Sequence, residues 1–140
     1  MKLLKVRCGD GVVPLNRHIE FPFHTPEGKP AGKMQSEFVK KVYALLKSVK
    51  IEGSTPQLKS YASSSGYGTY DIIWNFENKD ARFIITLDIC DWAVGVARGN
   101  KWFWHKTSKR YPTLEPSSFA NATKHWVKKG EETLSMLKEV

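Results

Sequence analysis

The sequence predicts an α+β fold, in which a mainly antiparallel sheet, formed as a meander, packs against an amphipathic helix and is followed by a C-terminal helix. Three patterns support this prediction. Apolar residues recur at helical spacing within Ser36–Lys50, alternate with polar residues between Tyr70 and His105, and return to helical spacing from Phe119 onward. The chain has 140 residues, 41% of them hydrophobic, which is enough for one ordinary core. We therefore expect residues 1–140 to form a single domain.

The N-terminal part is predicted to consist mostly of loops, because its first 35 residues are rich in glycine and proline. One strand-like segment, His18–Phe21, interrupts these loops. The amphipathic helix follows. Phe38, Val42 and Leu46 recur at the spacing that places side chains on one helical face, so we expect this face to contact the sheet.

Next comes a polar stretch, Ser60–Thr69, which is predicted to be a loop because it contains SSSGYG at its centre. The side-chain period then changes to two. Four strands are predicted in succession, at about Tyr70–Phe76, Phe83–Ile89, Trp92–Ala97 and Trp102–His105. Short turn sequences separate most of them, which is typical of an antiparallel meander.

The C-terminal segment Phe119–Val140 is predicted to be one helix, capped by Ser117 or Ser118. Gly130 is expected to weaken or kink this helix, because glycine costs about 1 kcal/mol relative to alanine there. We expect the helix to cover the sheet incompletely. An apolar patch with Trp126 at its edge would then mediate self-association or bind another protein.

Charge and composition favour a polyanionic partner. Lys and Arg outnumber Asp and Glu by 22 to 14, which gives a net charge of +8 and favours nucleic acid or the ribosome. A basic protein without such a partner would have the same composition. Cys8 and Cys90 are too few for a disulfide framework, and neither a metal-binding spacing nor a cofactor fingerprint is present. No segment is typical of a signal peptide or a membrane span, so a cytoplasmic protein without a membrane partner is expected.

The last predicted strand carries the candidate RNA surface. Simple alternation places Trp102 and Trp104 on one face and Phe103 on the other. Bases stack on aromatic rings, and Lys and Arg neutralise phosphates. The candidate RNA-binding residues are Arg98, Lys101, Trp102, Trp104, Lys106, Lys109 and Arg110. The alternative is that a helix covers the tryptophan face, as is common for aromatic faces of a meander.

The segment ITLDICDWAVGVARGNKWFW resembles the N-terminal half of the ribosome-inactivating proteins, the rRNA N-glycosidases, in which the corresponding strands have the form itLaiDvtnvYvvgyragnksyff. The similarity extends over roughly Phe21–His105. The matching positions are Thr86-Leu87, Asp88-Ile89, Val94-Gly95, Arg98-Gly99-Asn100-Lys101 and Phe103, and the helix from Phe38 to Leu46 also matches. The resemblance implies the fold of that half and ribosomal RNA or the ribosome as a partner.

The same resemblance bears on catalysis. The family removes one adenine from the sarcin-ricin loop, using two base-stacking tyrosines and a Glu-x-x-Arg pair on one helix. Tyr111, within the segment Tyr111-Pro112-Thr113-Leu114-Glu115, matches the first stacking tyrosine, although a tyrosine that only packs in a Pro-bounded loop would have the same context. No Glu-x-x-Arg helix follows the strands. The resemblance therefore implies a non-catalytic module that binds a protein or RNA, or alternatively the first chain or a fragment of a processed N-glycosidase.

A helix, three strands and a helix also describe the double-stranded-RNA-binding domain, which is a competing fold. That domain grips phosphates with lysines at the start of its last helix. Here Lys128 and Lys129 lie in the middle of the predicted helix, and a fourth strand intervenes. The meander reading is therefore preferred.

Overall fold

The computed structural model describes residues 5–8, 11–14, 23, 32–62, 68–88, 91–108, 111 and 113–138. Two antiparallel strands, β1 (Lys5–Cys8) and β2 (Gly11–Pro14), form a hairpin. The main sheet has five antiparallel strands in chain order: β3 (Gln57–Ala62), β4 (Gly68–Phe76), β5 (Ala81–Leu87), β6 (Trp92–Arg98) and β7 (Lys101–Ser108). The described helices are α1 (Gly32–Leu46), α2 (Pro116–Lys124) and α3 (Val127–Ser135), with one 3₁₀ turn at Glu77–Lys79. The predicted α+β class is confirmed.

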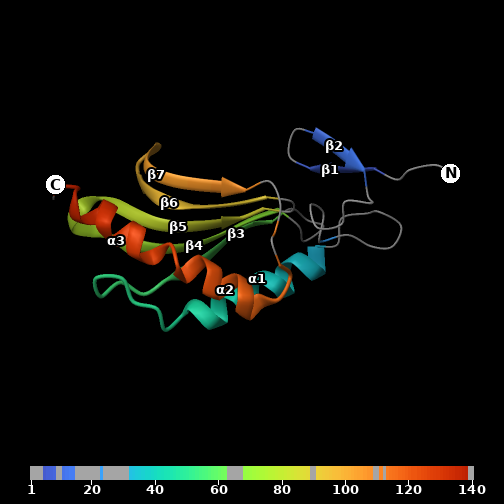
Figure 1. Ribbon diagram of the computed structural model, residues 1–140, viewed down its shortest axis with the longest axis horizontal. Coiled ribbons are helices and arrows are strands. Elements are labelled where there is room, and N and C mark those ends of the chain that lie inside the picture. The colour runs from blue at the N-terminus through green and yellow to red at the C-terminus, as the bar shows by residue number, and fades with distance from the viewer. Residues whose placement is uncertain are drawn as a thin grey trace.

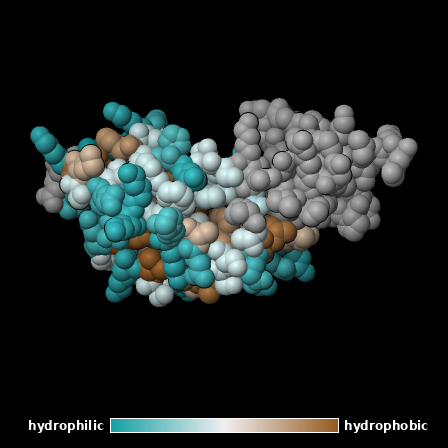
Figure 2. Space-filling model, in the orientation of Figure 1, coloured by the Kyte–Doolittle hydropathy of each residue, from teal (hydrophilic) through white to brown (hydrophobic). Residues whose placement is uncertain are grey.

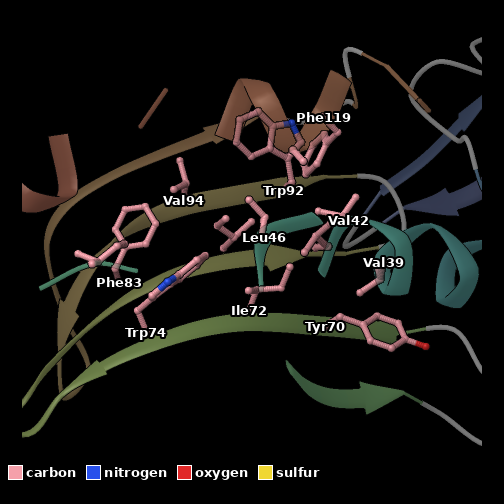
Figure 3. Packing of buried hydrophobic residues seen from close by; sticks show 14 of the residues in the cluster. Val39, Val42, Leu46, Tyr70, Ile72, Trp74, Phe83, Trp92, Val94 and Phe119 are labelled. Atoms are coloured by element: carbon pink, nitrogen blue, oxygen red, sulfur yellow. The ribbon is translucent and has the colours of Figure 1, made fainter. Parts of the chain in front are cut away.

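The three helices lie on one face of the five-stranded sheet (Figure 1). Strand alternation directs apolar side chains towards them: Ile72, Ile85 and Val94 are neighbours across β4, β5 and β6, and each is almost completely buried. Val42 and Leu46 extend from α1 towards these strands (Figure 3). The core therefore lies between the helices and this sheet face, which leaves the other face, here called the open face, without a described helix.

The loop predicted for Ser60–Thr69 is wrong at both ends. β3 extends to Ala62 and β4 begins at Gly68, and the two strands pair in register. The sequence of β3 gives little signal, because this edge strand half-buries Leu58 and leaves Tyr61 exposed. The strand predicted at His18–Phe21 lies outside the described residues, as do Ile89 and both cysteine side chains.

Helix α1 begins at Gly32, before the predicted start at Ser36, and ends at Leu46. Gln35, which is fully buried, explains the earlier start. Its Nε2 donates to the Gly68 carbonyl at 2.6 Å, and its Oε1 accepts from the Gly68 N–H at 2.9 Å. These two bonds satisfy a buried amide and join the first turn of the helix to the start of β4.

The single C-terminal helix was a wrong prediction, because α2 and α3 are separate helices with a break at His125 and Trp126. Gly130 lies inside α3 and is buried against the Phe83 ring. A Cβ at this position would come within 2.4 Å of that ring. Gly130 is therefore a point of close helix–sheet approach, not the point at which the helix breaks.

Two basic side chains fix the end of α3 to the turns of the sheet. Lys79 Nζ donates to the Leu134 carbonyl at 2.5 Å. The guanidinium of Arg98 donates to the carbonyls of Lys79 and Lys138 at 2.9 and 2.8 Å. Cations near a helix C-terminus satisfy free carbonyls and interact favourably with the helix dipole, so these bonds hold α3 in place over β5 and β6.

Candidate nucleic-acid interface

The edge strand β7 contains a bulge that changes the direction of its side chains. Val96 pairs with Trp104, but the next residue, Ala97, pairs with Trp102, so Phe103 has no partner on β6. Val96 belongs to the helix-facing core, whereas Ala97 lies on the open face. Trp102 and Trp104 therefore lie on opposite faces of the sheet. The prediction that they share one face was wrong, because simple alternation does not account for the extra residue.

Trp102 lies on the open face above Gly95. A Cβ at Gly95 would come within 2.7 Å of Trp102 Cζ3, so the indole ring rests against the glycine backbone. The His105 ring lies beside it, with centroids 5.4 Å apart and a 38° tilt. Trp102 remains 40% exposed, so solvent reaches a large part of the ring.

Trp104 and Lys106 lie on the helix-facing side, at the junction of α2 and α3. The Trp104 and Trp126 rings pack with centroids 5.7 Å apart, and His125 contacts Trp126 at its edge. Lys106 Nζ lies 4.8 Å from the centroid of Trp126. This is a cation–π distance, so the lysine helps to cover the indole ring while its own charge stays exposed.

The remaining predicted RNA-binding residues have different surroundings. Lys101 Nζ lies 5.2 Å from the centroid of the Phe103 ring, and the Arg98 guanidinium lies 5.6 Å from it. Arg98 is half-buried and already bonded to two backbone carbonyls, so its main contribution is structural. Lys109 and Arg110 lie outside the described residues.

The β7 rim is defined here as strand β7 (Lys101–Ser108) together with His125 and Trp126. It contains two lysines, two histidines and no acidic residue. On the open face, Asp71, Asp88 and Asp91 lie towards the opposite end of the strands from Trp102. Glu77 and Asp80 lie beside Arg82, at the β4–β5 turn. Burial raises the pKa of Asp71, although a hydrogen bond with Thr86 and the charges of Arg82 and Lys59 oppose that rise. A polyanion is therefore favoured along β7, which carries no carboxylate, and disfavoured beside Asp71 and Asp88.

Tyr111 is a core residue. Its side chain is 1% exposed, and its ring packs against Phe23, Phe38 and Phe119 with centroid distances of 5.4 to 5.7 Å. Its hydroxyl donates to the Asp88 carbonyl at 2.6 Å. Burial, followed by the charges of Asp88 and Asp91, raises the pKa of Tyr111 well above its usual range. With the ring enclosed in this way, the placement favours packing over the base-stacking role that the family resemblance implied.

Sequence reasoning missed the role of Gly95, which only the cross-strand register reveals. It also missed a polar hollow of about 350 Å³ at the β4–β5 turn, of which Arg82 forms part of the lining. The residues lining this hollow are Gln57, Asn75, Phe76, Glu77, Asp80, Ala81 and Arg82. In the part of the chain that the structure describes, no group of three or more His, Cys, Asp or Glu side chains is placed to hold a metal ion.

Comparisons of the chain with family models, curated proteins and solved structures returned no match. They do not point to the ribosome-inactivating proteins, so that resemblance depends only on the residues quoted above. Within the described ranges, none of the helices is both long enough and apolar enough to cross a membrane.

Proposed function

We propose that this chain is a non-catalytic RNA-binding module and that the β7 rim is its binding surface. The observation that supports this proposal most directly is the combination of exposed aromatic rings and lysines on one edge strand. Trp102 and Phe103 are 40% and 38% exposed, and Lys101 and Lys106 lie on the same strand. Aromatic rings stack with bases and lysines neutralise phosphates, which together suit single-stranded nucleic acid.

A protein partner is less well supported by the same strand. Edge strands can pair with an extended peptide, but lysines and bulges are features that oppose such pairing, and β7 has both. Trp126, predicted as the edge of an apolar patch, is half-buried beside Trp104 and Lys106. On the face shown in Figure 2, hydrophobic residues form small separate patches. Self-association or protein binding through Trp126 stays a prediction.

RNA affinity should fall steeply with salt if phosphate contacts dominate binding. We expect the double substitution Lys101→Gln, Lys106→Gln to weaken binding of a fluorescent single-stranded RNA 10-mer, and to reduce the slope of log K against log salt by roughly 0.7 for each lysine that contacts a phosphate. Anisotropy titrations at several salt concentrations measure both effects. Lys40→Gln, Lys41→Gln on α1 is the charge-matched control, because both lysines are exposed away from β7. Equal losses in the two double variants would contradict a site at the β7 rim.

We expect no depurination of ribosomes by this chain. None of its arginines has a glutamate three residues before it, so the Glu-x-x-Arg pair of the N-glycosidases is missing. Loss of a group that stabilises developing charge typically slows catalysis on the order of a hundredfold or more. Incubation with ribosomes followed by aniline treatment of the rRNA tests the prediction. A specific cleavage fragment would instead support the alternative that the chain is part of a processed N-glycosidase.

A further inference from the structure

We propose that Trp102 is a preformed stacking platform for an unpaired RNA base, and that Gly95 holds it in position. This inference rests on the RNA-binding function proposed above and specifies the nucleotide state that the site recognises. It concerns only the open-face side of the β7 rim, where Trp102, Gly95 and His105 meet.

Gly95 determines how closely the indole ring approaches the sheet. A Cβ there would lie 2.4 Å from the Trp104 carbonyl oxygen, 2.7 Å from Trp102 Cζ3 and 2.8 Å from His105 Cβ. Real Cβ atoms do not tolerate such distances, and the carbonyl belongs to the backbone of the neighbouring strand, so it cannot move away easily. Any larger residue at Gly95 would therefore push the ring of Trp102 outwards or distort the pairing of β6 with β7.

The bulge at Phe103 determines on which face of the sheet the Trp102 ring lies. If Phe103 paired with Ala97 and there were no bulge, Trp102 would share the face of Trp104 and would be directed towards Trp126 and the helices. With it, the ring lies on the open face, 40% exposed, with His105 beside it. A partly exposed aromatic ring that is already fixed in place loses little conformational entropy when a base stacks on it.

The surroundings favour an unpaired nucleotide over a duplex. A base can present its flat face to Trp102 only when it is unstacked from its neighbours, as in single-stranded RNA. Asn75, Arg82 and Ala97 lie in the same cross-strand row as Trp102. Asn75 and Arg82 also line the polar hollow of about 350 Å³, together with the carboxylates of Glu77 and Asp80. Strand spacing of about 4.8 Å places Arg82 two strands, or roughly 10 Å, from β7. Its guanidinium donates to the Gly99 carbonyl at 2.9 Å in the β6–β7 turn and stays exposed, so it is within reach of the next nucleotide.

Affinity measurements with a 5′-fluorescein single-stranded RNA 10-mer of mixed sequence, and with the matching RNA duplex, test the proposal. We expect Trp102→Ala to weaken single-strand binding about 5- to 150-fold, the range for loss of one base–aromatic stack. Trp102→Phe should retain most of the affinity, and duplex binding should be weaker and insensitive to either change. Tyr61→Ala is the control, because Tyr61 is an exposed aromatic residue on the far edge strand β3 and should leave affinity unchanged.

Gly95→Ala tests the positioning role. We expect it to weaken single-strand binding on the order of tenfold or more while thermal unfolding remains cooperative. If this variant does not fold, the three aromatic variants still decide whether Trp102 is the platform. If the wild-type chain binds RNA and neither Trp102→Ala nor Tyr61→Ala changes the affinity, Trp102 is not a stacking platform. The proposed RNA-binding function would still stand. Absence of RNA binding by the wild-type chain would overturn the proposed function itself.

Discussion

Replacing Tyr111 with alanine is expected to lower the free energy of unfolding by about 3–5 kcal/mol, the range for removing a large buried aromatic side chain. The ring is packed between Phe23, Phe38 and Phe119, and it connects the α1 side of the core with the start of α2. Its removal would leave a cavity among rings that have little freedom to move into it. Urea denaturation monitored by circular dichroism measures the loss.

Tyr111→Phe separates packing from the hydroxyl group. This variant keeps the ring but loses the bond to the Asp88 carbonyl. We therefore expect its free energy of unfolding to fall by about 0.5–1.5 kcal/mol and its RNA binding to be unchanged.

The pH dependence of stability provides a second test of the buried hydroxyl. Because the folded pKa of Tyr111 is raised, the neutral hydroxyl contributes stability that is complete below about pH 10 and is lost as the pH rises towards the folded pKa. Tyr111→Phe should lack that contribution. A Tyr111→Ala variant that has normal stability but no longer binds RNA would instead support a stacking role for Tyr111.

Gly130→Ala is expected to destabilise the fold by about 1–3 kcal/mol, although alanine is the better helix former by about 1 kcal/mol. The reason is the contact with Phe83, whose ring lies 2.4 Å from the position of the new Cβ. Phe83 is fully buried and packs edge-on against Trp74 at 5.3 Å, so its ring has little room to yield (Figure 3). The helix must therefore move away from the sheet.

Two variants make this prediction specific. Lys129→Ala changes the neighbouring exposed position of α3 and should be within about 0.5 kcal/mol of wild type. Combining Gly130→Ala with Phe83→Leu should recover part of the loss beyond additivity, because the smaller side chain relieves the overlap. Thermal and urea unfolding of the wild type, Gly130→Ala, Phe83→Leu and the double variant completes the cycle, with Lys129→Ala measured beside them. A stabilising effect of Gly130→Ala would show that the close approach of α3 to Phe83 is wrong.

The strand pattern of the sheet could be predicted because β4, β5 and β6 bury one face strongly. Tyr70, Ile72 and Trp74 alternate with Asp71, Ile73 and Asn75. The polar residues among the second set identify the core-facing side, although Ile73 is buried as well. The edge strand β3 could not be found in this way, because an edge strand buries little and its alternation is weak. The first turn of α1 is joined to the sheet by the bonds between Gln35 and Gly68. These two residues are 33 positions apart in sequence, so a local pattern does not reveal the contact.

The candidate site was predicted only in part. Sequence composition identified Trp102 and the neighbouring lysines, but not the face on which each lies. The Phe103 bulge depends on cross-strand register, and register is set by tertiary pairing as well as by local pattern. The contact between Gly95 and the Trp102 ring also depends on this register, so the sequence does not show it. Arg98 likewise appeared as a free cation, whereas its bonds to Lys79 and Lys138 depend on the folded position of α3.

The most direct test of the proposed RNA interface is a two-dimensional ¹H–¹⁵N NMR titration that follows the indole N–H groups of the five tryptophans. Each indole N–H signal reports the surroundings of its own tryptophan. The signal that is missing from the spectrum of Trp102→Phe is thereby assigned to Trp102. On addition of the single-stranded RNA 10-mer, we expect the Trp102 signal to shift most, whereas the signal of Trp74, which is buried and donates to the Val49 carbonyl, stays in place. A Trp102 signal that remains unchanged at saturating RNA would contradict the account.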